Sequence, residues 1–452
     1  MSRRGRDKGK GRSELRRINP RAAGIDIGSA SHWVAIDPSL NERPVREFAA
    51  YTGDIQALAT WLIEHGVETV AMEATGVYWV ALFEVLRDRG LEVCLVDARA
   101  TKQVAGRKSD ISDCQWIQEL HSYGLLKQAF VPEARIATLR SYVRQRDRWV
   151  ADAGRAIQHM QQALELMNVK LTEVVSDITG VTGLAIIDCI LAGERDAGRL
   201  SEFRDPRCSR SQEEIARALL GSWREEHLFA LGQARDYYRY LGERIAACDA
   251  QIAAVMTACA SAQSTHPPPS KPGKRDFTAH PFGFDAHGHC YRLAGVDLTA
   301  IDGVGVNTVL TVLSETGADM SPWRSEHAFG SWLGIAPNTR TSGGRIQRSA
   351  TRANAQRAAT AFRLAAQALS RSKSALGAFY RRLRARIGAP KAITATAYKL
   401  AKLFYCMLKT KRPYQDIGQA AYDERFRARR LRSVKRMAAE LGFNLVPAES
   451  GA

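Results

Sequence analysis

The chain has 452 residues, a length that allows two to four domains with buried cores. Lysine and arginine number 65 against 47 aspartate and glutamate residues, and the formal net charge of +18 predicts a polyanionic partner. No apolar run approaches the roughly eighteen residues of a membrane-spanning helix, and no apolar core follows the basic N-terminus. These features exclude a membrane or exported protein, and we expect a cytoplasmic protein whose scattered cysteines are reduced.

Residues 1–20 are basic and rich in glycine, and we expect them to be disordered. The region 21–130 then alternates between strand and helix patterns, which is typical of a compact α/β domain. The expected elements are strands at 22–28, 33–36, 67–73 and 91–96 and helices at 55–66, 79–89 and 110–126.

Four acidic residues in this domain lie in segments that are too apolar or too tightly turned to be ordinary surface. Asp26 interrupts an apolar strand, where a carboxylate without a cation or hydrogen bonds is costly. Glu73 ends a strand, and the C-terminal ends of strands are where α/β folds place ligands. Asp110 and Asp113 are spaced i, i+3 at the start of a helix, so both lie on one of its faces.

Together these residues supply the hard oxygen ligands that an octahedral Mg²⁺ or Mn²⁺ site requires. Two such ions would support an in-line displacement at a phosphodiester. Each acid also has a plainer interpretation. Asp26 would stabilise a turn, whereas Asp110 and Asp113 would cap a helix and interact with its dipole.

In the region 138–258 the apolar residues recur with a period of seven, which predicts a helical coiled coil. One row contains Val143, Val150, Ile157, Leu164 and Leu171, and its partner row contains Ala153, Met160, Met167 and Val174. A second run between residues 231 and 255 repeats the pattern. The two helices would pair either within one chain or between two chains, and the long seam favours an oligomer.

The region 259–291 loses this period and contains three consecutive prolines, which indicates a flexible linker or insertion. A second, helical domain is expected at 292–412. Within it Gly303 and Gly305 separate two expected helices, the pattern of a helix-hairpin-helix whose turn presents backbone N–H groups to a phosphate. A plain helix C-cap is the alternative interpretation.

Two further features of the C-terminal half favour nucleic-acid chemistry. Ser342 precedes two glycines, a sequence that suits an exposed nucleophile or a phosphate cradle, although the residues alone favour a plain glycine-rich turn. The glycines and the basic residues that follow are Gly343, Gly344, Arg345, Arg348 and Arg352. The tail at 413–452 is also basic, and Arg429, Arg430 and Arg432 are candidates for phosphate contacts or for a solvated helix face.

The order of these motifs resembles one family, the DEDD-type insertion-sequence transposases (insertion sequence family one-hundred-ten), which are RNA-guided recombinases. The resemblance covers about residues 21–130 and 295–412. It rests on four motifs in order, Gly24–Gly28, Met72–Trp79, Gly106–Asp113 and Ser331–Gly344. The chain departs from the family pattern at Arg345, where lysine is common, and at Cys114, where alanine is common.

The resemblance implies a RuvC-like (ribonuclease-H-like) N-terminal domain, a coiled-coil arm and a helical C-terminal transposase domain. It implies that Asp26, Glu73, Asp110 and Asp113 bind Mg²⁺, and that Ser342 is the nucleophile that forms a transient phosphoserine link to DNA. A neighbouring subunit's acids would complete the site, which implies a dimer or tetramer. A non-coding guide RNA would pair with donor and target DNA, so the protein would bind DNA and RNA and be associated with the nucleoid.

The residues leave other functions open. A nuclease of the Holliday-junction resolvase type would use the same acids with water as nucleophile. A nucleic-acid-binding protein without catalysis would use the glycine turn and the basic tail alone. An actin-like sugar kinase would share the Asp26-Ile27-Gly28-Ser29 loop, but it needs a second α/β half, whereas the C-terminal half here is predicted to be helical and basic.

Overall fold

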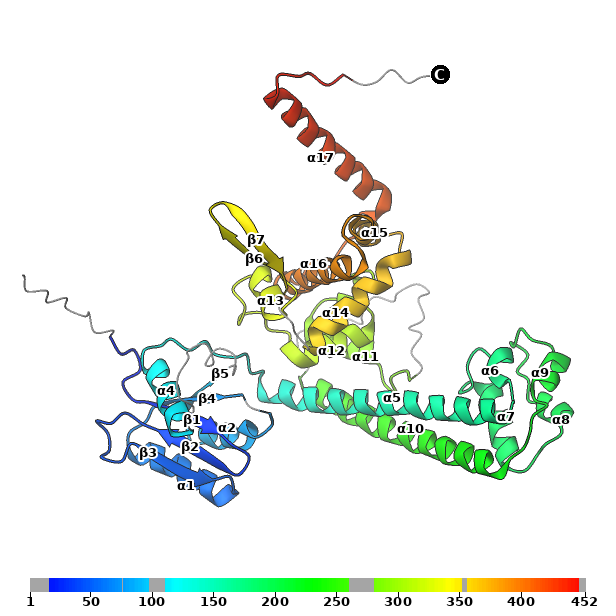
Figure 1. The fold of residues 1–452 in the computed structure, drawn as a ribbon, viewed down its shortest axis with the longest axis horizontal. Helices are drawn as coiled ribbons and strands as arrows, with labels where there is room; N and C mark the ends of the chain where they lie inside the picture. The colour runs from blue at the N-terminus through cyan, green and yellow to red at the C-terminus, as the bar shows by residue number, and fades with distance from the viewer. Residues whose placement is uncertain (1–15, 75, 97–109, 260–279, 352–355, 447–452) are drawn as a thin grey trace, which may run out of the picture. The chain divides into compact units, whose positions relative to one another are not determined.

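The computed structural model describes residues 16–74, 76–96, 110–259, 280–351 and 356–446 (Figure 1). The chain divides into two compact units, Met1–Val131 and Pro132–Ala452. Within the described residues, no helix combines the length and the apolar character needed to cross a membrane.

In the described part of the first unit, five strands form one sheet in the order β3-β2-β1-β4-β5. β1 is antiparallel to β2 and parallel to β4. β3 adds to β2 in the antiparallel sense, and β5 adds to β4 in the parallel sense. The strands are β1 (Ala22–Ile27), β2 (Ser31–Ala35), β3 (Val45–Ala49), β4 (Thr69–Glu73) and β5 (Glu92–Val96).

Helices cover both faces of this sheet, and alternate side chains of each strand meet different helices. Ile25 and Met72 belong to the core shared with α1 and α2. On the opposite face, Ala71 packs with Ile117 of α4. The mixed α/β architecture predicted for this unit is therefore confirmed. Its helices include α1 (Thr52–Glu64), α2 (Trp79–Asp88) and α4 (Asp110–Ser122).

The edge strand β3 is absent from the elements that the sequence predicts. Its residues Arg46 and Glu47 are exposed, and only Phe48 is buried. Charged side chains are common on edge strands because they discourage pairing with other chains. The same charges weaken the apolar alternation by which a strand is identified, so β3 resembles a polar loop in the sequence.

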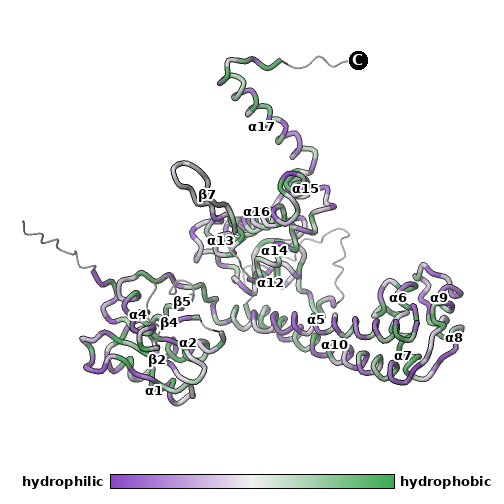
Figure 2. Tube along the Cα trace, in the orientation of Figure 1, coloured by the Kyte–Doolittle hydropathy of each residue, from purple (hydrophilic) through white to green (hydrophobic). Residues whose placement is uncertain are grey.

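In the second unit, α5 (Ala134–Leu166) and α10 (Glu225–Cys259) run antiparallel along each other (Figure 1). Hydrophilic and hydrophobic residues intermix along both helices (Figure 2). The predicted heptad rows lie at the shared face. The two helices therefore pair with each other within one chain. Buried members of the rows include Val143, Ala153, Met160 and Leu164 on α5 and Leu231, Leu241, Ile245 and Ile252 on α10. Three predicted members, Met167, Leu171 and Val174, lie beyond the end of α5.

A buried ion pair interrupts the apolar seam of the helix pair. Arg146 Nε lies 2.5 Å from Asp249 Oδ1, and the two side chains are only 5% and 6% exposed. Arg146 Nη2 also donates a hydrogen bond to the His280 carbonyl oxygen at 3.1 Å. Its guanidinium carbon lies 4.1 Å from the centroid of the Phe282 ring. Gly283 N–H donates to Asp249 Oδ2 at 3.0 Å, so this pair fixes the chain at 280–283 against both helices.

We expect Arg146→Ala to lower the free energy of unfolding by about 3–5 kcal/mol, because it leaves the Asp249 carboxylate buried without its partner. Chemical denaturation of the full chain measures this change. Arg239→Ala is the matched control, since Arg239 and its partner Asp236 are both 66% exposed and such pairs contribute about 1 kcal/mol or less. Equal effects of the two substitutions would contradict the structural role of the buried pair.

Short helices close the far end of the helix pair, where they share an apolar core with α5 and α10. They are α6 (Leu171–Val174), α7 (Val181–Leu191), α8 (Ala197–Ser201) and α9 (Gln212–Ala218). These elements connect α5 to α10 and explain how two long helices of one chain pair in opposite directions.

The remainder of the second unit is largely helical, as predicted, but it also contains a β-hairpin. Helix α11 begins inside the segment that the sequence assigns to a linker, and the proline run of that segment lies outside the described residues. The elements are α11 (Ala286–Ala294), η1 (Leu298–Ala300), α12 (Val306–Thr316), α13 (Glu326–Trp332), β6 (Asn338–Ser342), β7 (Arg345–Ala350), α14 (Arg357–Ala368), η2 (Leu369–Arg371), α15 (Ala375–Ile387), α16 (Ala389–Thr410) and α17 (Gly418–Glu440).

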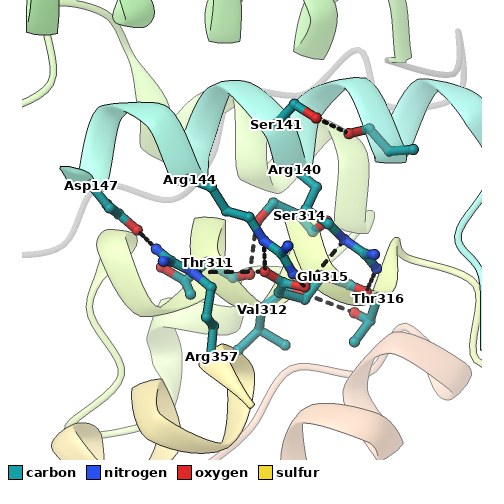
Figure 3. Close-up of polar contacts among 11 residues, drawn as sticks. Arg140, Ser141, Arg144, Asp147, Thr311, Val312, Ser314, Glu315, Thr316 and Arg357 are labelled. Atoms are coloured by element: carbon teal, nitrogen blue, oxygen red, sulfur yellow. Dashed lines mark hydrogen bonds and ion pairs between the residues drawn. The ribbon is translucent and has the colours of Figure 1, made fainter. Parts of the chain in front are cut away.

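A charged cluster joins these helices to α5 (Figure 3). The buried Glu315 of α12 accepts hydrogen bonds from Nε and Nη2 of Arg144, each at 2.8 Å. Arg140 Nε lies 3.1 Å from the same carboxylate. Arg357 of α14 pairs with Asp147 of α5 and reaches to 3.8 Å from Glu315. Because the charges are paired across three helices, we infer that α5, α12 and α14 move as one group.

Candidate active site

The sheet register places Asp26 and Glu73 side by side. The parallel pairing of β1 with β4 aligns Ile25 with Met72, so Asp26 and Glu73 are the next residues on adjacent strands. Neighbouring strands lie about 4.8 Å apart, and residues at matched positions project from the same face. Both side chains are half-buried. The two carboxylates therefore occupy one face of the sheet at the C-terminal end of its central parallel strands.

The same face is covered by α4, which brings Asp113 toward these strands. Gly24 lies two residues before Asp26 and so projects from the Asp26 face. A Cβ atom at Gly24 would lie 2.2 Å from Gln118 N and 2.4 Å from Cys114 O, both backbone atoms of α4. Only glycine therefore permits this close approach of helix and strand.

Cys114 lies close to two of the acids, Asp26 and Asp113. Burial raises the pKa of the Cys114 thiol to about 12, and the charges of Asp26 and Asp113 contribute to the rise. The thiol Sγ donates a hydrogen bond to the Ile111 carbonyl oxygen at 3.2 Å. At neutral pH the thiol is therefore protonated, and it adds no charge beside these carboxylates.

The structure tests only part of the predicted metal site. Asp110 is the first residue of α4, but its side chain lies outside the described residues. Among the side chains that are described, no group of three or more histidine, cysteine, aspartate or glutamate residues has the geometry to hold a metal ion. Asp26 and Glu73 lie on the sheet face that α4 covers, Asp113 belongs to α4, and the donor chemistry of the three fits Mg²⁺ or Mn²⁺. Their closure around an ion stays a prediction.

Ser342 lies at the tip of the β6–β7 hairpin. It pairs with Arg345 across the turn and is exposed. Gly343 and Gly344 have φ angles of 56° and 74°, and a turn with two left-handed residues is the type that connects tightly twisted strands. The two glycines are therefore explained by the hairpin itself, which presents the serine hydroxyl to solvent at the end of a projecting ribbon.

The turn that contains Gly303 and Gly305 is packed against the protein interior. A Cβ atom at Gly303, whose φ is 83°, would lie 2.7 Å from the Ala365 carbonyl oxygen of α14. Gly305 is the residue that precedes α12. The element before the turn is the single 3₁₀ turn η1. Neither glycine ends an α-helix, so the C-cap interpretation is wrong. A 3₁₀ turn stands where the first helix of a helix-hairpin-helix is expected, so that motif is not confirmed, and phosphate binding by this turn stays a prediction.

The predicted basic residues differ in what the structure describes. Arg345 and Arg348 belong to β7, but the structure does not describe their side chains. Arg352 lies outside the described residues. Arg429, Arg430 and Arg432 are exposed on α17. The tail that was predicted from charge alone is thus helical over most of its length.

Gly24 is the functional residue that was not singled out from the sequence. Its position in an apolar strand, two residues before a conspicuous acid, is the pattern that indicates close approach by another backbone. Cys114, which departs from the family pattern, lies close enough to Asp26 and Asp113 for their charges to raise the pKa of its thiol.

Two family models match the chain. One, for the DEDD-type IS110 group and described as a transposase, matches residues 23–169. The other, described as the transposase IS116/IS110/IS902 family, matches residues 297–381. No curated protein matches the chain. The first match contains Asp26, Glu73, Asp110 and Asp113 and the second contains Ser342. The chain therefore belongs to the IS110 family of transposases, enzymes that cut and rejoin DNA.

Proposed function

We propose that this transposase exchanges DNA strands with Ser342 as nucleophile and with divalent metal bound by Asp26, Glu73, Asp110 and Asp113. The observation that carries the metal site is the register of β1 and β4, which puts Asp26 and Glu73 on the face covered by α4. The strand order β3-β2-β1-β4-β5, with antiparallel β1 to β3 and parallel β4 and β5, supports the assignment to the ribonuclease-H-like folds. When bound, Mg²⁺ would neutralise charge on the scissile phosphate and on the leaving oxygen.

In the proposed reaction the Ser342 oxygen forms a bond to phosphorus and its proton passes to solvent. The bond from phosphorus to the leaving deoxyribose oxygen breaks, and that oxygen takes up a proton. A hydroxyl of the second DNA strand then attacks the phosphoserine and releases the serine. The exposed position of Ser342 on a hairpin supports this role, because a large DNA substrate must reach the hydroxyl.

A covalent intermediate is the direct test of this role. With a suicide DNA substrate whose cut end diffuses away, we expect the wild-type chain to accumulate a protein–DNA adduct and Ser342→Ala to form none. Thr341→Ala is the control for the adjacent hydroxyl and should keep the adduct. Cleavage without any adduct in the wild-type chain would overturn the nucleophile assignment.

A resolvase-type nuclease is the second candidate. It is favoured by one observation, that all four acids belong to the first unit whereas Ser342 belongs to the second. Hydrolysis by water would need only the first unit and would leave Ser342 without a role. Strand cutting by Ser342→Ala at the wild-type rate would support this candidate.

We also propose a homo-oligomer in which one chain supplies the serine and another the acids, as the family resemblance implies. Mixing Glu73→Gln chains with Ser342→Ala chains should then restore part of the activity that each lacks. No restoration would mean that both groups must come from one chain.

The partner nucleic acids include, in this proposal, a non-coding guide RNA as well as DNA. Sequencing the RNA that copurifies with the protein tests this part. One enriched RNA with segments complementary to both DNA partners is expected, whereas random cellular RNA would contradict guidance. A chain that binds nucleic acid but cuts none would instead be a binding protein.

A further inference from the structure

The C-terminal helix α17 is anchored at one end. Arg382 of α15 pairs with Asp423 at 2.6 Å. Its guanidinium carbon lies 3.5 Å from the centroid of the Phe426 ring and 4.8 Å from that of Tyr422. Arg381 also donates a hydrogen bond to Gln419 at 2.8 Å. These contacts fix the first two turns of α17, and with them the direction of the rest.

Beyond the anchor, most side chains of α17 are exposed. None of its residues, all of which the structure describes, is buried. Arg425, Arg429, Arg432 and Arg436 follow one another at spacings of three or four residues, so like charges are neighbours on the helix surface. Such pairs destabilise an isolated helix, and a long helix without packing is marginal in water. A polyanion that neutralises the charges would remove this repulsion.

The basic residues of α17 are not spread evenly around it. Arg429, Arg432, Ser433 and Arg436 line a shallow groove. With 3.6 residues per turn, these four residues form a stripe along one side of the helix. This arginine stripe begins one turn after the anchored Phe426. Arg427, Arg430 and Lys435 project from other sides of the helix.

An apolar stripe lies on the far side of the same helix. Leu431, Val434 and Leu441 are spaced by three and seven residues and are all exposed. This stripe is separated from the groove by about half a turn of helix. The two stripes therefore lie on different sides of the helix. Arg425, Arg429, Arg432 and Arg436 concentrate positive charge on the side opposite the apolar stripe, whereas the other basic residues are dispersed.

We propose that the groove formed by Arg429, Arg432, Ser433 and Arg436 binds the phosphate backbone of duplex DNA. Planar guanidinium groups bond phosphate oxygens in a bidentate manner, and the serine hydroxyl adds a neutral donor. DNA is the polyanion on which the IS110 family acts. The assignment differs from the charge-based prediction, because Arg436 and Ser433 are included and Arg430 is not. It rests on family membership and on α17, and not on the proposed chemistry of Ser342.

The salt dependence of DNA binding by the full chain tests the proposal. Each phosphate contact contributes about 0.9 to the slope of log K against log salt. For the variant Arg429→Gln/Arg432→Gln/Arg436→Gln, the magnitude of the slope of log K against log salt should therefore be smaller by about 2 to 3 than for the wild type. The variant Arg427→Gln/Arg430→Gln/Lys435→Gln removes the same charge from the other sides and should keep most of the wild-type slope. Equal slopes for the two variants would overturn the proposal, because general charge would then account for binding.

Two further measurements separate other occupants of the groove. If the groove variant weakens binding of the copurified RNA but not of duplex DNA, the groove binds RNA and the proposal is wrong. If it changes the oligomeric state in sedimentation, the groove contacts a second copy, and the proposal is again wrong. The salt slopes are measured on DNA binding alone and do not require strand cutting by Ser342. A failure of the proposed chemistry would instead remove the adduct from wild type and variant alike.

Discussion

Replacing Glu73 by glutamine should lower the rate of strand transfer by at least about a hundredfold, the usual scale for loss of an electrostatic group that acts on a developing charge. Asp26→Asn should have a similar effect, because the two carboxylates are in register on adjacent strands. Neither substitution changes the size of the side chain appreciably, so the sheet should be preserved. Rates of recombination on donor and target DNA, measured with binding affinity on the same substrates, check both results.

Glu68→Gln is the matched control for these variants. Its side chain is 71% exposed just before β4, and it pairs weakly with Arg21 at 3.4 Å. We expect wild-type rates for this variant and wild-type DNA affinity for all three. Strand transfer retained in Glu73→Gln and Asp26→Asn would contradict the assignment of the acids to catalysis.

Gly24→Ala should lower the free energy of unfolding by about 3 kcal/mol, at the upper end of the range for overpacked cores. The added methyl group would lie 2.2 Å from Gln118 N, and a helix backbone cannot move aside as a flexible side chain can. Displacing α4 would also move Asp113 away from Asp26 and Glu73, so activity should fall even where the protein remains folded. Thermal denaturation and the strand-transfer assay measure the two effects.

The control for this variant is Gly53→Ala in α1, where a Cβ atom would meet nothing within 4 Å. It should be neutral or slightly stabilising, since alanine favours helix over glycine by up to about 1 kcal/mol. Similar melting temperatures for the Gly24→Ala chain and the wild type would show that α4 does not pack against β1 as the structure has it.

Much of the architecture could be predicted from the sequence where a short-range period determines the structure. The heptad positions of Val143 and Leu241 indicated the shared face of the long helices, and both side chains are buried there. The pairing of Arg146 with Asp249 could not be predicted, because the partners are 103 residues apart and nothing local specifies the choice. The hairpin at Ser342 was missed because its flanking residues are polar and basic and lack apolar alternation.

The candidate site was predictable to the level of faces and ends of elements. A strand that ends at Glu73 and an acid inside the preceding parallel strand were enough to place two carboxylates together. The position of α4 depends on Gly24, whose importance follows from a contact in three dimensions. The distances among the carboxylate oxygens depend on side-chain rotamers and on Asp110. The spacing of the acids in the sequence does not determine these distances, so metal coordination could not be predicted from it.

Anomalous scattering from crystals of the full chain grown with Mn²⁺ tests the central claim most directly. We predict manganese at the C-terminal end of β1 and β4, with oxygens of Asp26, Glu73 and an α4 aspartate within about 2.2 Å, the distance typical of such ligands. The signal should disappear in Glu73→Gln crystals. Manganese bound elsewhere, or bound equally by Glu73→Gln, would contradict the claim that these acids form the catalytic metal site.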